Sequence, residues 1–163
     1  MFEHEFILAD NICHLNHAAV SPWPRRTVEA VRRFAEENGR TGSQNYAGWL
    51  QIEQQLREQL RRLINAASAD EIALLKNTSE GLSVVAYGLD WRSGDEIVIS
   101  DQEFPSNRIV WESLASLGVT VIQVDLMGAD SPEQALLGAV TPRTRLLSVS
   151  SVQYASGLAL NLE

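Results

Sequence analysis

Two hydroxyl residues, Thr78 and Ser79, stand between an apolar run and an apolar helical repeat in the stretch LLKNTSEGLSVVAYGL (74–89). Ser and Thr oxygens can accept hydrogen bonds from the open N–H groups of a first helical turn, so these hydroxyls could cap a helix without any ligand. The same groups, at the positive end of a helix dipole, can hold a phosphate. The stretch by itself allows both interpretations.

The elements around these hydroxyls alternate between strands and helices. Apolar runs bounded by turn residues predict strands, and apolar residues at helical spacing predict helices. Short connections between them predict a mainly parallel sheet with helices on both faces, an α/β architecture of three layers (α/β/α). The expected helices are 25–38, 47–64, 79–89, 106–117 and 131–140, and the expected strands are 72–76, 97–100, 119–125 and 145–152.

Three polar loops follow strands of this predicted sheet, at 77–80, 101–107 and 151–157. Ligands of parallel α/β sheets bind at the carboxyl ends of the strands. We therefore expect the three loops to converge on one rim. A dinucleotide site is not favoured there, because no G-x-G-x-x-G motif follows a strand.

The composition of the chain argues against some classes of binding partner. The chain has 163 residues with 21 acidic and 13 basic side chains, and its net charge of -8 argues against nucleic acid binding. No apolar run has transmembrane length and the start lacks a signal-peptide pattern, so we expect a cytoplasmic protein with no membrane partner. Cys13, in an apolar setting, is expected to be a buried structural thiol. The histidines do not have the spacing of a metal site.

Four segments in order resemble the class V aminotransferase family of fold type I pyridoxal-phosphate (PLP) enzymes, which includes cysteine desulfurases, kynureninases and isopenicillin-epimerase-like proteins. The segment LNHAAVSPWP (15–24) is similar to the family's "LN-x-A-A" segment, and NTSEGL (77–82) to its phosphate loop. DQEFPSN (101–107) resembles its "E-F-P-S" or "E-H-H-A-N" loop, and SSVQYASG (150–157) its "HVSN-x-x-G" segment. The resemblance spans nearly the whole chain.

The resemblance implies roles for individual residues. Thr78 and Ser79 would bind the PLP phosphate, serving as helix cap and phosphate seat together. Phe104 would stack on the pyridine ring, the alternative being a core residue. The segment His17, Ala18 and Ala19 would approach the substrate, the alternative being a tight surface turn.

The segment 150–157 departs from the family pattern. Relatives of the desulfurase type carry an asparagine that contacts the ring hydroxyl of the cofactor where this chain has Tyr154. Either Tyr154 or Gln153 would then replace that contact. Phe104 likewise replaces the histidine of many cysteine desulfurases, which favours the kynureninase or epimerase-like branch without selecting a reaction.

The family holds PLP on a lysine that comes much later in its sequence, and the single lysine here, Lys76, precedes the phosphate loop. No catalytic residue is therefore assigned. The resemblance implies a truncated chain: residues 1–45 form an amino-terminal segment with the first helix, and residues 46–163 the first part of a single, incomplete PLP-binding large domain. Because strand 72–76 would lack its neighbour, we expect a homodimer or a self-associating fragment.

The leading hypothesis is thus the amino-terminal part of a PLP-dependent, class V aminotransferase-like enzyme that acts on an amino acid or its derivative. The alternative is a non-catalytic α/β module that dimerises or binds a phosphorylated ligand.

Overall fold

The computed structural model describes residues 3–17 and 19–162. The chain divides into two compact units, Met1–Leu74 and Leu75–Glu163. The sequence-based division has its boundary earlier, between residues 45 and 46, whereas in the structure residues 46–63 form a helix that packs with the residues after it in the first unit. As a division by function, the sequence-based one stays a prediction.

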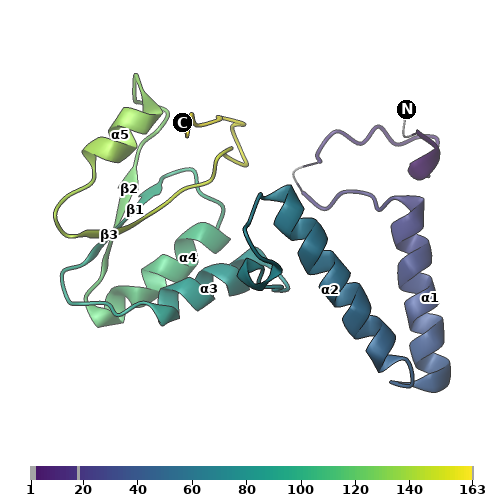
Figure 1. The fold of residues 1–163 in the computed structure, drawn as a ribbon. Helices are drawn as coiled ribbons and strands as arrows, with labels where there is room; N and C mark the ends of the chain where they lie inside the picture. Colours follow the sequence, from purple (N-terminus) through teal and green to yellow (C-terminus); the bar gives the residue numbers. More distant parts are fainter. Residues whose placement is uncertain (1–2, 18, 163) are drawn as a thin grey trace. The chain divides into compact units, whose positions relative to one another are not determined.

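The first unit contains two long helices, α1 (Arg25–Thr41) and α2 (Tyr46–Leu63), with short 3-10 helices η1 (Glu3–Glu5) and η2 (Ala69–Glu71) (Figure 1). Phe34 and Trp49 join α1 to α2 through an edge-to-face contact with centroids 5.2 Å apart. Neither helix buries a residue fully.

On α2, hydrogen bonds from Arg61 and then Arg62 lower the pKa of Glu58 to about 2.

The second unit is built on a parallel sheet of three strands in the order β2-β1-β3, with β1 at Glu96–Ser100, β2 at Thr120–Val124 and β3 at Thr144–Ser148. Helices α3 (Thr78–Gly88) and α4 (Ser106–Glu112), with η3 (Ser113–Leu117), cover one face, and α5 (Pro132–Gly138) covers the other (Figure 1). These are the three layers that the sequence predicted.

Strand β1 supplies the core of both layers because successive side chains of a strand point to opposite faces. Ile97 and Ile99 pack with Trp111 of α4 and Ala86 of α3, whereas Val98 packs with Leu136 of α5 and its neighbours. All five residues of β1 are buried, as expected for the central strand of a covered parallel sheet.

Helix α4 is tied to β3 by one buried amide. The Asn107 Oδ1 atom accepts hydrogen bonds from Trp111 Nε1 at 2.9 Å and from Ser148 Oγ at 2.6 Å. The amide nitrogen of Asn107 donates to the Ser148 carbonyl at 3.4 Å. This network fixes the start of α4 relative to the carboxyl end of β3, and so fixes the loop that leads into α4.

The other end of the sheet contains a charged group at the first residue of β1. The Glu96 carboxylate is buried and accepts hydrogen bonds from the Thr141 hydroxyl and from the Arg143 guanidinium. These bonds, that of Thr141 first, hold the pKa of Glu96 below its usual value. The contacts join the start of β1 to the turn before β3.

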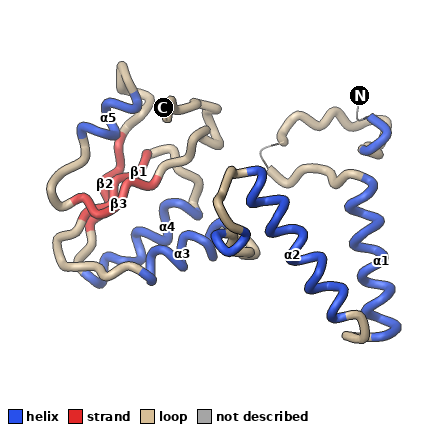
Figure 2. The backbone as a smooth tube through the Cα atoms, in the orientation of Figure 1, coloured by secondary structure: helices blue, strands red, loops and turns tan. Residues whose placement is uncertain are grey.

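The strand predicted at 72–76 is wrong: no strand is assigned to these residues, and Figure 2 draws the segment before α3 as loop. Extended backbone becomes a strand only where a neighbour accepts its hydrogen bonds. Ile72 has extended dihedral angles, but its carbonyl accepts from the Arg57 side chain instead. The expected self-association stays a prediction.

Strand β3 also stops earlier than predicted, at Ser148 and not at residue 152. The reason is local, since the backbone N–H of Ser150 donates to the Glu103 carboxylate and so leaves the sheet. The helix expected over 106–117 continues past α4 only as the 3-10 turn η3, which ends at Gly118 with a φ of 79°. Within the described residues, no helix has the length and apolar character needed to span a bilayer.

Candidate functional site

Helix α3 begins with a reciprocal cap. Asn77 Oδ1 accepts from the Glu80 N–H at 2.9 Å, and Glu80 Oε2 accepts from the Lys76 N–H at 2.8 Å. The prediction that Thr78 and Ser79 would cap this helix is therefore wrong, because Asn77 occupies the cap position and its side-chain oxygen accepts from the open Glu80 N–H. In the part of the chain that is described, neither the Thr78 nor the Ser79 hydroxyl has a hydrogen-bond partner, and both residues are exposed.

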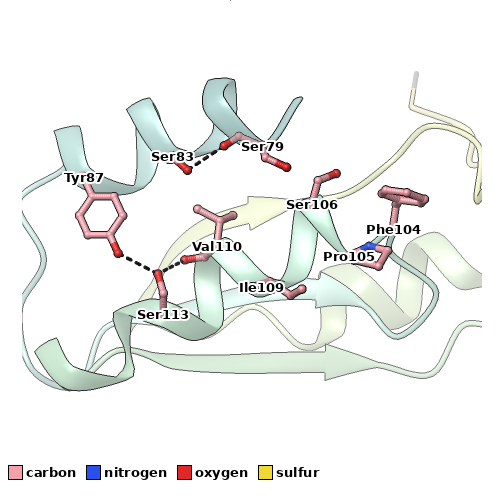
Figure 3. A pocket seen from close by; sticks show the side chains of 9 residues that line it. All are labelled: Ser79, Ser83, Tyr87, Phe104, Pro105, Ser106, Ile109, Val110 and Ser113. Carbon is pink, nitrogen blue, oxygen red and sulfur yellow. Dashed lines mark hydrogen bonds between the residues drawn. The ribbon is translucent and has the colours of Figure 1, made fainter. Parts of the chain in front are cut away.

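A pocket of about 420 Å³ lies between α3 and α4. Ser79 of α3 and Ser106 of α4 lie at one end of it, with Phe104 beside Ser106 (Figure 3). At that end, two hydroxyls and one aromatic ring face a common space. The lining is completed by Ser83, Tyr87, Pro105, Ile109, Val110 and Ser113.

The opposite end of the pocket is closed by a chain of hydrogen bonds (Figure 3). Ser113 Oγ donates to the Val110 carbonyl at 2.6 Å, so its single proton is used, and the Tyr87 hydroxyl must donate to Ser113 across 3.0 Å. Ser83 Oγ donates to the Ser79 carbonyl at 2.7 Å. The Tyr87–Ser113 bond joins the end of α3 to the end of α4, and the Ser83 bond lies within α3, so these hydroxyls already have partners, unlike that of Ser79.

Phe104 is 51% exposed, which contradicts the alternative of a core residue. Its ring meets Tyr154 edge-on, with centroids 5.0 Å apart and planes at 85°. Tyr154 comes from the loop after β3, so the geometry brings two of the predicted polar loops together, those at 101–107 and 151–157. Ser79, from the third loop, shares the pocket with Phe104.

Gln153 lies next to Tyr154 in the sequence but is only 1% exposed, and neither of the two residues lines the pocket itself. Its amide nitrogen donates to the Ser150 carbonyl at 3.2 Å and to Glu103 Oε1 at 3.4 Å. Its Oε1 atom is buried without a hydrogen-bond partner. The structure thus gives Gln153 contacts inside the loop, while Tyr154 is exposed beside Phe104.

Comparison with known families decides the relationship. A family model described as aminotransferase class-V matches residues 13–163. The chain belongs to the class V aminotransferase family. The prediction made from the four segments is therefore confirmed.

Curated relatives within the class V family include a probable cysteine desulfurase of Methanothermobacter thermautotrophicus, 36% identical across 93% of this chain and 38% of the relative. A probable cysteine desulfurase of Pseudomonas putida is 29% identical, covering 88% of this chain and 38% of that protein. The chain thus spans about two fifths of the length of these relatives.

Solved structures of PLP enzymes share the fold. A variant of C-DES with glycine covalently linked to its PLP cofactor superposes with a TM-score of 0.82 and 26% identity over 94% of this chain and 41% of that chain. The cysteine desulfurase CsdA of Escherichia coli superposes with a TM-score of 0.74 and 26% identity, over 91% of this chain and 39% of its own. The fold is therefore the predicted one, part of a fold type I PLP-dependent transferase large domain.

The amino-terminal segment that the class V resemblance assigned to substrate lies in the first unit. His17 is exposed and its ring meets that of His14 edge-on at 4.9 Å, and Ala19 is exposed. Ala18 lies outside the described residues. The substrate role of these three residues stays a prediction. Cys13 is exposed, so the expectation of a buried thiol is wrong: its apolar neighbours Ile12 and Leu15 are exposed as well.

Sequence reasoning assigned no role to Ser106, which lines the pocket, or to three residues that bond the segments beside it: Asn77, Gln102 and Glu103. Asn77 is an ordinary cap residue at the correct position, and it was overlooked because Thr and Ser follow it. Glu103 gives a weaker signal in the sequence, which is a carboxyl group in the loop after a buried strand. Among the residues described, no group of acidic, histidine or cysteine side chains could hold a metal ion.

Proposed function

We propose that this chain is the amino-terminal part of a PLP-dependent class V enzyme that acts on an amino acid or its derivative, and that the cofactor binds where Ser79, Ser106 and Phe104 meet. The observation that carries this proposal is that Ser79 and Phe104, which are 25 positions apart in the sequence, line one pocket. A flat ring and an anionic tail need one aromatic surface and one set of donors within such a space.

The phosphate end of the proposed site fits the residues present. Asn77 and Glu80 complete the helix cap by themselves, so the hydroxyls of Thr78 and Ser79 are available to a ligand. The first turn of α3 adds the positive end of an 11-residue helix. The nearby charge of Glu80 is opposed by the Lys76 ammonium group, 3.8 Å away.

The ring end fits as well. Phe104 offers an exposed planar face, and the edge contact with Tyr154 limits how that ring can turn. Of the two residues expected to reach the ring hydroxyl of PLP, we propose Tyr154, because Gln153 is buried and bonded within its own loop. Tyr154 is 57% exposed, which leaves its hydroxyl accessible.

When bound, PLP supplies an electron sink for the α-carbon of an amino acid. In the proposed site, Thr78 and Ser79 bind the phosphate group of PLP, Phe104 covers the pyridine ring, and Tyr154 contacts the ring hydroxyl of the cofactor. Lys76 is the single lysine of the chain and pairs with Glu80, so we assign it no catalytic role. Because the resemblance implies a cofactor lysine that comes much later in the sequence than Lys76, we propose cofactor binding, and no catalytic step, for the residues present.

The relatives narrow the substrate class. Two of them carry names for cysteine desulfurases, and a C-DES structure is described as a cystine C-S lyase with cysteine persulfide. A sulfur-containing amino acid is therefore the first substrate class to test.

A cofactor titration tests the proposal. PLP is titrated onto the 163-residue chain and followed by absorbance, for the wild type, Ser79→Ala and the matched control Ser83→Ala. Because a hydrogen bond to a charged group is worth about 1.5–3 kcal/mol, we expect Ser79→Ala to weaken PLP binding about tenfold or more. Ser83 lines the same pocket but its hydroxyl already donates to Ser79, so Ser83→Ala should bind PLP as the wild type does.

The second candidate function is a non-catalytic module that binds a phosphorylated ligand. The availability of the Thr78 and Ser79 hydroxyls favours it equally. The same titration, repeated in competition with inorganic phosphate, separates the two functions, since equal affinity for PLP and for inorganic phosphate would support the module and remove the role of Phe104. An absence of any PLP binding, or unchanged binding in Ser79→Ala, would contradict the proposed cofactor site.

A further inference from the structure

Three consecutive residues after β1 each contact a different part of the loop after β3. Gln102 Oε1 accepts from Ser156 Oγ at 2.6 Å. Glu103 contacts Ser150 and Gln153, and Phe104 packs against Tyr154. The aromatic pair therefore lies beside a set of polar bonds that join the same two segments.

Glu103 makes the most of these bonds and is 4% exposed. Its Oε1 atom accepts from the Ser150 N–H at 2.6 Å, and its Oε2 atom accepts from Ser150 Oγ at 2.6 Å. Gln153 Nε2 adds a third donor at 3.4 Å. No basic side chain among the described residues forms an ion pair with Glu103. Burying a carboxylate costs free energy unless it is hydrogen-bonded, and these three donors offset that cost for Glu103.

The loop that Glu103 contacts is closed upon itself. The Gln153 N–H donates to the Leu158 carbonyl at 2.8 Å, and the Gly157 N–H donates back to the Gln153 carbonyl at 2.9 Å. Gly157 has a φ of 72°, a value that glycine adopts without strain. Tyr154 lies inside this turn, so a carboxylate that holds Ser150 and Gln153 also sets where the Tyr154 ring stands.

We propose that Glu103 is a positioning residue whose carboxylate holds the turn at 150–157, so that Tyr154 stands against Phe104 and fixes the plane of the ring wall. The inference rests on the proposed function for the identity of the ligand, PLP, that this wall would cover. Glu103 itself does not line the pocket, and its effect on a ligand passes through the two aromatic rings.

The contact between the rings gives the direct test. Nuclear Overhauser effects between the Phe104 and Tyr154 rings, and amide exchange at Ser150, are measured for the 163-residue wild type, Glu103→Ala and Glu103→Gln. We expect Glu103→Ala to lose the ring contact and to exchange faster at Ser150. Glu103→Gln keeps one carbonyl oxygen for the Ser150 N–H and should restore both signals in part. Glu29→Ala, which removes an exposed carboxylate on α1, is the matched control.

Ligand binding gives the second readout. Glu103→Ala should weaken PLP binding about threefold to tenfold, the range expected for one aromatic contact, and leave the affinity for inorganic phosphate unchanged. A role in overall stability alone would lower both affinities together. Should Glu103→Ala fail to fold, Ser150→Ala removes one of the three donors and should shift both readouts by a smaller amount.

The outcomes separate the two proposals. Retention of the ring contact in Glu103→Ala, or an equal loss of PLP and phosphate affinity, would overturn the positioning role. If the wild type bound no PLP, the proposed function would fail, while the ring contact and the exchange of Ser150 would still decide whether Glu103 positions Tyr154.

Discussion

The buried amide of Asn107 permits a quantitative prediction about stability. Replacing Asn107 with alanine removes the acceptor for Trp111 Nε1 and Ser148 Oγ at once. Trp111 is 1% exposed, so its N–H would be left without a partner at a cost of about 1–3 kcal/mol. Ser148 is half-buried and its hydroxyl can turn toward another acceptor, which adds about 1 kcal/mol. We expect Asn107→Ala to lower the free energy of unfolding by about 2–4 kcal/mol.

A double-mutant cycle isolates the hydrogen bond from the loss of packing. Trp111→Phe removes the indole N–H while keeping an aromatic ring in the core, and the double variant lacks both partners. The energies are obtained from urea unfolding followed by circular dichroism at neutral pH. Because Asn107 and Trp111 are in contact, their effects should be non-additive, with a coupling energy of about 1–2 kcal/mol.

The cycle can fail in an informative way. Additive effects, with a coupling energy within about 0.3 kcal/mol of zero, would show that the hydrogen bond between Asn107 and Trp111 contributes nothing measurable. Any stabilisation by Asn107 would then come from its packing and from its hydrogen bonds to Ser148 of β3.

Two further predictions concern the cap of α3 and the charge at the start of β1. Asn77→Ala should lower the free energy of unfolding by about 1 kcal/mol, measured by urea denaturation. Asn45→Ala is the control and should leave the free energy of unfolding nearly unchanged, because Asn45, the cap residue of α2, makes no side-chain cap bond. Equal effects of the two substitutions would contradict the assigned cap. Because the pKa of Glu96 is lowered in the folded state, its stabilisation is complete above the unfolded pKa and is lost as pH falls through the folded value. Thr141→Val should therefore reduce the loss of stability between neutral and acid pH, measured as urea midpoints, and an unchanged pH dependence would refute the assigned hydrogen bond.

Most of the second unit could be predicted from sequence because its local signals agree with its tertiary packing. The apolar run at 97–100 is buried on both faces, and Ser131 caps a helix whose first residue is Pro132, as expected. The strand expected at 72–76 shows the limit of that reasoning. An apolar run specifies a strand only together with a neighbour, and sequence periodicity does not report which neighbours are present.

The sequence could predict which segments form the candidate site, but not which hydrogen bonds their side chains make. The polar loops at 77–80 and 101–107 meet at one pocket, as the carboxyl-end rule implies. Sequence patterns could not show that Asn77 relieves the hydroxyls of capping, nor that Gln153 turns inward while Tyr154 turns outward. Both depend on distances of a few ångströms between side chains from separate segments.

The bonds made by residues 102–104 have a consequence for the length of the polypeptide. Each of these three residues contacts a different residue of the segment 150–156. Inserting or deleting one residue here would therefore break all of these contacts at once. Surface connections usually tolerate such changes. This short connection should not tolerate them. The number of residues between the end of β1 and the start of α4 therefore determines the geometry of the pocket together with the side chains that line it.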